Sequence, residues 1–276
     1  MEEVYEDAYT RNDHFSFGKN WINFLKSLDK RKIQEAEKSL TKFLGEDDIS
    51  GKSFVDIGCG SGLFSLAAYD LGVERLVSID IDDSSLKCAE YLRKKRNVTE
   101  NWSIKKGSAL DSVFIGSLGQ FDVVYSWGVL HHTGDMWRAI ENSIQTVRTG
   151  GLFYIALYNK NTKYRLEGTS DIWVKLKKIY NSYGTIVKRF MEAIYLAYFF
   201  IGLLLHGMNP VSYVKRYDTL RGMDFFTDIR DWLGGYPYEF ASVVEVKEFF
   251  AARGFECRKV KDVRSLGCNE FLFLRK

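Results

Sequence analysis

The chain has 276 residues, of which 46% are hydrophobic and 27% are charged, and its formal net charge at pH 7 is +3. This composition is typical of a soluble globular protein with one sizeable core and a smaller appended module. The acidic, polar start is unlike a secretory signal, and the four scattered cysteines lack metal-ligand spacing. We therefore expect a cytoplasmic protein with reduced thiols and no metal site.

Helical and strand patterns alternate through the first 158 residues. Residues 21–44 carry apolar side chains at three- and four-residue spacing, which predicts an amphipathic helical region. The predicted strands are Ser53–Ile57, Arg75–Ile81, Trp102–Lys106, Phe121–Ser126 and Leu152–Tyr158. The predicted helices are Leu63–Leu71, Ser84–Lys95 with a serine cap, and Met136–Val147 ended by Gly150-Gly151. This alternation predicts a parallel sheet with helices on both faces.

The end of the chain predicts two further strands. A helix is expected at Val243–Arg253, followed by strands at Phe255–Val260 and Glu270–Leu274. About nine residues join these strands, too few for a helical crossover, so the last strand should be antiparallel. The predicted fold is α/β: a Rossmann-like seven-stranded, mostly parallel sheet with an antiparallel last strand, plus a helical cap insertion after the fifth strand.

The segment Val55–Gly62, VDIGCGSG, joins the first strand to a helix. Glycines there allow close approach of a ligand at the helix N-terminus, and the alternative is a tight turn without a ligand. The spacing is G-x-G-x-G, with Leu63 where the dinucleotide fingerprint needs its third glycine. A nicotinamide-dependent oxidoreductase is therefore disfavoured, and Asp56 suits a cationic group such as an amine.

This glycine turn resembles motif I of class I S-adenosylmethionine (SAM)-dependent methyltransferases. Asp80 matches the acidic residue that binds the ribose hydroxyls in that family. Phe121–His132 matches the fourth-strand motif, and Thr149-Gly150-Gly151 matches the usual PGG with threonine in place of proline. The resemblance implies that SAM is the cofactor and that the cofactor-binding residues are Asp56, Gly58, Cys59, Gly60, Gly62, Asp80, Ile81, Ser108, Ala109 and Ser126.

Two histidines are the candidate catalytic residues. A hydroxyl acceptor benefits from a general base, and neutral imidazole is suited to that role near pH 7. His131 and His132 follow the fourth strand, at the sheet edge where ligands bind. Either could be the base, with His131 slightly favoured, and the alternative is a helix start that serves packing.

Four further residues are candidates for contact with the substrate. Asn20 and Trp21 lie in a segment that forms a lid over the SAM pocket in similar methyltransferases, or else Trp21 belongs to the core. Tyr236 and Glu239 lie in the stretch WLGGYPYEF, which is dense in glycine and aromatic residues. They either line the acceptor pocket, where one of them could replace the histidines as base, or form a well-packed turn.

The insertion is basic and contains a long apolar run. Residues 160–216 hold ten lysines and arginines against three acidic residues, and Ala193–Leu205 holds thirteen uncharged residues in a row. That run is too short to span a bilayer. It predicts a buried helix of a substrate lid, a homodimer interface, or peripheral membrane contact through residues 171–206. No RNA-binding motif is present, so nucleic acid is disfavoured as a partner.

The sequence thus predicts three regions and an enzyme of the EC 2.1.1 type. Residues 1–48 form an N-terminal helical lid segment, residues 49–158 and 241–276 the SAM-binding core, and residues 159–240 the helical insertion or cap. We expect O-methylation of a small metabolite or of a saccharide or lipid-linked hydroxyl. The alternatives are an RNA or protein methyltransferase and a non-catalytic SAM-binding module. The protein is expected in the cytoplasm, with membrane association as a variant of that expectation.

Overall fold

The computed structural model of this chain describes residues 25, 28–98, 100–162, 168–217, 225–263 and 266–276. These residues form two compact units. The sheet unit contains the described residues up to Asp171 together with Glu239–Lys276, and the insert unit contains those of Ile172–Tyr238. Asn20 and Trp21, the two candidates of the N-terminal lid, lie outside the described residues.

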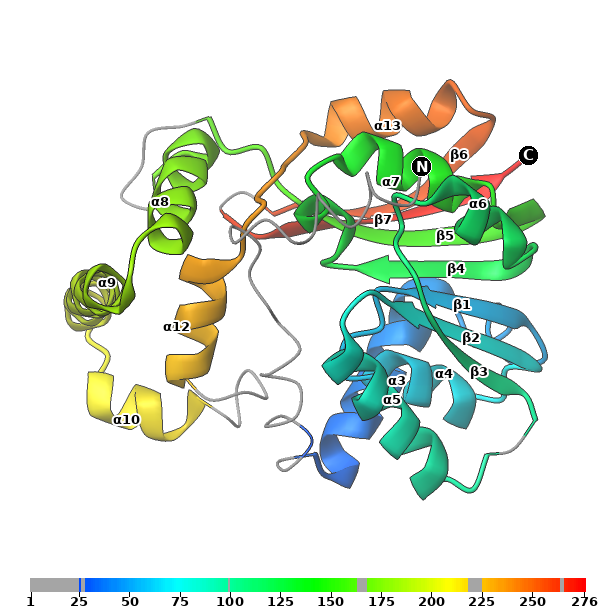
Figure 1. Cartoon of the computed structure of the whole chain (residues 1–276), viewed down its shortest axis with the longest axis horizontal. Coiled ribbons are helices and arrows are strands. Elements are labelled where there is room, and N and C mark those ends of the chain that lie inside the picture. Colours follow the sequence, from blue (N-terminus) through cyan, green and yellow to red (C-terminus); the bar gives the residue numbers. More distant parts are fainter. Residues whose placement is uncertain (1–24, 26–27, 99, 163–167, 218–224, 264–265) are drawn as a thin grey trace. The chain divides into compact units, whose positions relative to one another are not determined.

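The sheet unit is built on a seven-stranded sheet in the order β3-β2-β1-β4-β5-β7-β6 (Figure 1). The strands are β1 (Ser53–Ile57), β2 (Arg75–Asp80), β3 (Trp102–Lys106), β4 (Phe121–Trp127), β5 (Val147–Tyr158), β6 (Phe255–Lys261) and β7 (Cys268–Arg275). The first five strands pair in parallel, whereas β7 runs antiparallel to both β5 and β6. The predicted fold, including its antiparallel last strand, is confirmed. Strand order reverses between β1 and β4, the point at which such sheets bind ligands.

Helices cover both faces of this sheet. They are α3 (Lys30–Leu44), α4 (Leu63–Asp70), α5 (Asp83–Lys95), α6 (Ser112–Ser117), the 3₁₀ turn η1 (Leu130–His132), α7 (Met136–Ile144) and α13 (Val243–Ala251). One hydrophobic cluster joins a face of the sheet to α3, α4 and α5, and the other joins the opposite face to α6, α7 and α13. Side chains alternate between the faces because a strand has a period of two: Phe54 belongs to the first cluster and Val55 to the second.

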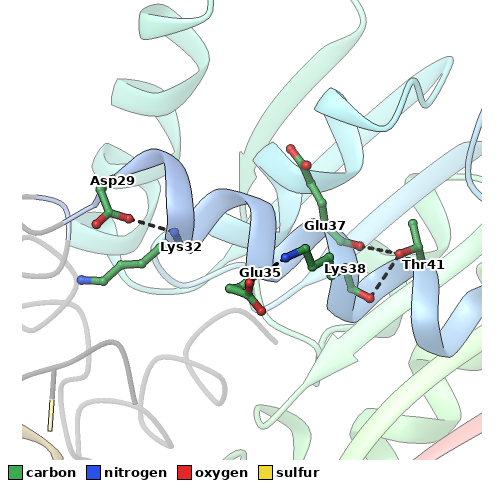
Figure 2. A network of polar contacts seen from close by, with 6 residues as sticks. All are labelled: Asp29, Lys32, Glu35, Glu37, Lys38 and Thr41. Atoms are coloured by element: carbon green, nitrogen blue, oxygen red, sulfur yellow. Dashed lines mark hydrogen bonds and ion pairs between the residues drawn. The ribbon is translucent and has the colours of Figure 1, made fainter. Parts of the chain in front are cut away.

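The helix α3 is amphipathic, as its spacing predicts. Its polar face holds local contacts, with Asp29 accepting from the Lys32 amide at 2.8 Å and Lys38 pairing with Glu35 at 2.9 Å (Figure 2). The Thr41 hydroxyl donates to carbonyls one turn back. The buried face consists of Ala36, Leu40, Phe43 and Leu44. The helix therefore stabilises the unit through its apolar face, while its exposed ion pair contributes little.

Two local expectations need correction, and one short helix was not predicted. The cap of α5 is Asp82, whose carboxylate accepts from two backbone amides, and not a serine. The helix α7 ends at Ile144, and Gly150-Gly151 lie inside β5 rather than ending a helix. A Cβ at Gly151 would lie within 3.0 Å of three backbone carbonyls, so close backbone approach beside an irregularity in the β4–β5 pairing requires glycine there. The short helix α6 was not predicted.

The insert unit is helical. Its helices are α8 (Ser170–Ser182, from Ile172 onward in this unit), α9 (Thr185–Leu205), α10 (Pro210–Lys215) and α12 (Phe225–Gly234). The basic segment Asp171–Glu192 is divided between α8 and α9 by a break whose last residue, Gly184, is the N-cap of α9. Among the described residues, no helix has both the length and the hydropathy needed to cross a bilayer.

A buried lysine lies at the centre of the insert unit. Lys177 on α8 is fully buried, and its Nζ donates to the carbonyl of Trp232 on α12. The same ammonium lies 4.2 Å from the ring centre of Trp232 and 4.9 Å from that of Tyr238. Burial lowers the pKa of Lys177 to about 7. The lysine thereby joins α8 to α12 through a polar contact enclosed by aromatic rings.

Candidate cofactor and active site

The glycine turn connects the end of β1 to the start of α4. Gly58, Gly60 and Gly62 all have positive φ, a region that other residues rarely adopt. The amides of Gly58 and Cys59 donate to the carbonyl of Ile79, at 2.8 and 2.9 Å. The turn is therefore fixed to the end of β2, at the carboxyl edge of the sheet.

Two of these glycines are required by close neighbours as well as by φ. A Cβ at Gly58 would lie 2.3 Å from Val129 Cγ1, and a Cβ at Gly62 would lie 2.8 Å from the Ala89 Cα. Val129 is the N-cap residue of η1. The turn is consequently packed against α5 on one side and against the start of the histidine segment on the other.

Asp80 ends β2 beside the turn. One of its carboxylate oxygens accepts from the Gly60 amide at 2.9 Å, and the other accepts from the Asp82 amide at 2.9 Å. A carboxylate has about four acceptor positions, so each oxygen can accept one more bond, as a vicinal diol requires. Burial raises the pKa of this carboxyl. The chemistry of Asp80 therefore fits the ribose of SAM.

Asp56 lies in β1, below the turn, and is almost fully buried. Its carboxylate accepts from the Ser65 hydroxyl at 2.6 Å. The Ser78 hydroxyl donates to Ser65 at 2.7 Å, and the Trp102 indole donates to Ser78 at 2.8 Å. Burial, together with the charge of the neighbouring Asp80, raises the pKa of Asp56 to about 7. A buried carboxyl of this kind is stabilised in its charged form by a cation placed close to it.

The loop after β3 meets the end of β2. The Gly107 amide donates to the Asp80 carbonyl at 3.0 Å. Within this loop the Ser108 hydroxyl accepts from the Leu110 amide at 3.1 Å, and the Ala109 carbonyl accepts from the Asn142 side chain at 2.9 Å. Ser108 and Ala109 are partly exposed. The structure thus brings this loop to the carboxylate proposed to hold the ribose.

The two histidines of η1 differ in exposure. His131 is fully buried, and its Nδ1 accepts from the Tyr158 amide at 3.3 Å. His132 is partly exposed, and its ring centre lies 4.5 Å from that of His131. An imidazole whose Nδ1 accepts a backbone bond has a fixed ring and tautomer. His131 is therefore suited to positioning the segment, and His132 is the one accessible to a reactant.

Glu239 fixes the segment that carries these histidines. Its amide donates to the His131 carbonyl at 2.9 Å. Its carboxylate accepts from the amides of Gly134 and Met136, both at 3.0 Å. Burial raises the pKa of this carboxyl, while the two amides lower it. Glu239 therefore supplements the N-cap residue Asp135 at the N-terminus of α7 and ties η1 to the segment that enters α13.

The remaining candidate residues are distributed between the two units. The Ser126 hydroxyl on β4 donates to the Ile57 carbonyl at 2.9 Å. Cys59 is buried in the turn, and burial raises the pKa of its thiol. Ile81 follows Asp80 and is partly exposed. Tyr236 belongs to the insert unit. Among the described residues, no group of His, Cys, Asp or Glu is arranged to hold a metal ion.

Three supporting residues of the site were not predicted from the sequence. Ser65 and Ser78 connect Asp56 to Trp102, and Val129 packs against Gly58. A serine inside the apolar helix LFSLAAYD and another inside the buried strand RLVSID are signals that could have been used. Buried hydroxyls need partners, so two of them on neighbouring elements indicate a shared network.

Residues 29–191 match the family model described as a methyltransferase domain. A ubiquinone biosynthesis O-methyltransferase of Methylobacterium sp. (strain 4-46) is 28% identical over 120 residues, 44% of this chain and 46% of that protein. A ribosomal protein L11 methyltransferase of Alteromonas mediterranea is 38% identical over 63 residues, 23% of this chain and 22% of that protein. The chain spans less than half the length of these curated relatives.

Among solved structures, the fold is similar to that of a magnesium protoporphyrin IX methyltransferase from Synechocystis PCC 6803 with bound SAH. The TM-score is 0.52 at 12% identity, covering 88% of this chain and 83% of that one. The family model covers more than half of the chain and includes the glycine turn, Asp80 and both histidines. SAM is accordingly the cofactor, and the chain belongs to the class I SAM-dependent methyltransferases.

Proposed function

We propose that this protein transfers the methyl group of SAM to an oxygen of a small-molecule, saccharide or lipid-linked acceptor. The observation that carries the proposal is the contact between the glycine turn and η1. Val129, the residue before η1, packs against Gly58 so closely that no side chain fits there. That contact fixes the start of a segment whose partly exposed His132 is suited to accept a proton from a hydroxyl.

Each residue of the site then has a proposed role. SAM supplies an electrophilic methyl group on a sulfonium, and Asp80 holds the ribose hydroxyls through its remaining acceptor positions. Asp56 acts near the amino group of the cofactor, directly or through water. Ile81, Ser108 and Ala109 surround the adenine. In a direct displacement, much of the rate enhancement comes from aligning the acceptor and excluding water.

His132 is the proposed general base, and His131 is proposed as a positioning residue. The ring of His131 is buried and bonded to the Tyr158 amide, so it holds η1 in place. The carboxylate of Glu239 accepts hydrogen bonds from two backbone amides. We therefore assign Glu239 a positioning role and not the role of the base. Tyr236 is retained as a proposed acceptor contact.

Similarity supports oxygen as the acceptor atom and leaves one alternative. The relative with the longer match is a ubiquinone biosynthesis O-methyltransferase. The relative with the higher identity is a ribosomal protein L11 methyltransferase, so a protein acceptor is the second candidate. The proposed location is the cytoplasm.

The proposal is tested with SAM that carries a labelled methyl group. The protein is incubated with an extract of its source, which is then separated into small-molecule, polysaccharide, lipid, protein and RNA fractions. An Asp80→Ala variant is the control that lacks cofactor binding. Label in the small-molecule, polysaccharide or lipid fraction, absent from the control, supports the proposal. Alkali-labile label indicates a methyl ester, and mass spectrometry of alkali-stable label identifies whether the methylated atom is oxygen.

The other outcomes contradict the proposal. Label confined to the protein or RNA fraction overturns the acceptor class. A third outcome is that calorimetry shows SAM binding but no fraction is labelled. If added small-molecule, saccharide and lipid compounds with free hydroxyl groups are also not methylated, the protein is a SAM-binding module rather than an enzyme.

A further inference from the structure

The helix α9 presents an apolar face to solvent along its whole length. Over 21 residues it extends about 31 Å. The exposed fractions of six large apolar side chains on this face lie between 54% and 87%. These side chains, which we call the α9 stripe, are Ile186, Phe190, Ile194, Ile201, Leu204 and Leu205. At 100° per residue they fall within one sector of about 100°.

This arrangement is the reverse of that in an ordinary surface helix. The opposite side of α9 contributes Leu203 to the core of the insert unit. It also contributes the partly buried Glu192, whose carboxylate accepts from Tyr180 at 2.8 Å and pairs with Arg189 at 3.0 Å. Thus the polar contacts lie toward the unit and the apolar stripe lies toward solvent. Contiguous exposed apolar surface of this extent marks an interaction site.

Neighbouring elements of the insert unit extend the apolar surface. Ile179 on α8, Met208 after α9, Val211 on α10 and Phe226 on α12 have exposed fractions between 42% and 64%. Together with the α9 stripe, these four side chains give the insert unit many large exposed apolar residues. On the helices α4, α5 and α7 of the sheet unit, by contrast, the large exposed apolar residue is Tyr91.

The exposed charged side chains of the helices α8 to α10 in the insert unit are positive. Within residues 172–217, the charged side chains classed as exposed are Lys175, Lys178, Arg189, Lys215 and Arg216. All five are basic. A cavity of about 230 Å³ between α9 and α12 adds Arg230 beside Arg189, against the single carboxylate of Glu192. An exposed apolar face on a unit whose exposed charges are lysines and arginines is complementary to a surface that is apolar inside and anionic outside.

We propose that the α9 stripe binds the surface of an anionic lipid bilayer, with the helix lying in the plane of the interface. A helix that crosses the bilayer is not required, and none of the described helices has the length and hydropathy for one. A second copy of the chain is a poorer occupant, because two such faces would bring basic side chains together without exposed carboxylates to pair with them. The inference is independent of the methyl acceptor.

Vesicle flotation of the full chain tests this proposal. The probes are vesicles of phosphatidylcholine alone and of phosphatidylcholine with about one third phosphatidylglycerol. We expect binding to the anionic vesicles that is at least ten-fold stronger than to the neutral ones. The triple variant Phe190→Ser, Ile194→Ser, Ile201→Ser is expected to lose at least ten-fold in binding. The double variant Lys175→Gln, Lys178→Gln is expected to bind more weakly and with less dependence on salt.

A matched control uses exposed apolar residues of the sheet unit. Val113 and Val244 are 81% and 61% exposed, and Val113→Ser with Val244→Ser should leave vesicle binding unchanged. SAM affinity, measured by calorimetry, and helix content, measured by circular dichroism, should be unchanged in every variant. Unchanged helix content shows that the helical insert unit is still folded when vesicle binding is lost.

Three results would overturn the inference. These are no binding to anionic vesicles, equal binding to both kinds of vesicle, and undiminished binding of the triple serine variant. Light scattering tests the alternative that a second copy of the chain covers the stripe. If the wild type is a dimer, the triple variant is a monomer and neither protein floats with vesicles, the stripe is a subunit interface.

Discussion

The buried Asp56 and the partly exposed Asp80 lie on the neighbouring strands β1 and β2 and differ in their partners. Asp80 accepts two backbone amides, whereas Asp56 accepts from one hydroxyl that itself receives a bond from another serine. Backbone amides stabilise the charged form of a carboxyl more than a single shared hydroxyl does. Asp56 is therefore the carboxyl whose charge state should respond to pH and to a bound cation.

The first prediction concerns Asp56→Asn and pH. The pKa of Asp56 is raised to about 7, above about 3.9 in the unfolded chain. The stability that this carboxyl contributes is thus fully present below pH 4 and is lost as the pH rises through 7. The variant should gain stability relative to wild type between pH 5 and pH 8, by about 2 kcal/mol.

Urea unfolding at the two pH values measures this difference. Asp47→Asn is the matched control because Asp47 is exposed, and it should show no gain between pH 5 and pH 8. If Asp56→Asn behaves like Asp47→Asn, Asp56 is already ionised in the folded protein and the prediction is wrong.

The second prediction separates the two histidines. With the acceptor identified, His132→Gln should lower kcat/KM by about 10²- to 10⁴-fold, the range for loss of a general base. In the wild type, kcat/KM should decline at acid pH because a protonated imidazole cannot act as a base, and this decline should be absent from His132→Gln. His131→Gln should leave that decline in place, because His131 is buried and fixed by the Tyr158 amide. The reverse pattern in the two pH profiles would assign the base to His131.

At the scale of elements, the start of α4 depends on a residue without a side chain. Gly62 is the N-cap of α4 with φ of 77°, and a Cβ there would lie 2.8 Å from the backbone of α5. The third prediction is that Gly62→Ala destabilises the protein by about 2–4 kcal/mol, from the left-handed conformation and the overlap together. It should also weaken SAM binding at least ten-fold.

Gly116→Ala is the matched control for this prediction. Gly116 lies in α6, and nothing is within 4 Å of a Cβ placed there. Alanine at that position should be neutral or stabilise the protein by up to about 1 kcal/mol. Thermal unfolding and calorimetry on both variants compare them, and equal effects of the two substitutions would show that the turn tolerates a side chain.

The fourth prediction concerns the cap of α7. Glu239→Ala removes the acceptor for two amides at the start of that helix and should cost about 1–2 kcal/mol in the free energy of unfolding. Glu239→Gln keeps an acceptor and should recover part of this loss. Glu248→Ala, an exposed substitution on α13, should change stability by less than about 0.5 kcal/mol. An equal effect of Glu239→Ala and Glu248→Ala in urea unfolding would contradict the proposed cap.

At the scale of the whole molecule, the two segments of the sheet unit that precede and follow the insert unit in the chain are hydrogen-bonded to each other. Asn159 and Ala241 form a parallel bridge, and the Lys160 amide donates to the Ala241 carbonyl at 3.2 Å. Adjacent exit and entry points are typical of insertions that a domain can lose. The sheet unit also contains its own two hydrophobic clusters.

The fifth prediction follows from this connection. A variant in which a short Gly-Ser linker replaces residues 172–238 should unfold cooperatively and bind SAM with an affinity within about ten-fold of wild type. It should not float with anionic vesicles, because the α9 stripe is absent. Loss of SAM binding in a variant that still unfolds cooperatively would show that the insert unit contributes to the cofactor site.

The sequence by itself determined the sheet and the cofactor class. Strands such as Ser53–Ile57 are short apolar runs bounded by turn residues, and this local pattern does not depend on distant contacts. The G-x-G-x-G turn and Asp80 are likewise local signals, because the ligand requires them at fixed places along the chain. The roles of Gly150 and Gly184 were harder to predict, because a glycine can end a helix, separate two helices or lie within a strand. Gly150 lies in β5, and Gly184 separates α8 from α9.

Tertiary structure decided which side chains are accessible and which support others. His131 and His132 are adjacent in the sequence but differ in exposure. The buried ring of His131 lies 4.0 Å from that of Tyr158 on β5 and accepts from the Tyr158 amide, whereas the partly exposed ring of His132 lies 5.4 Å from Tyr158. Glu239 reaches α7 from about a hundred residues away, and no local pattern can specify such a contact. The apolar run of α9 was visible in the sequence, but only packing shows that its Ile, Phe and Leu side chains face outward, since hydropathy alone does not indicate which side of a helix its neighbours cover.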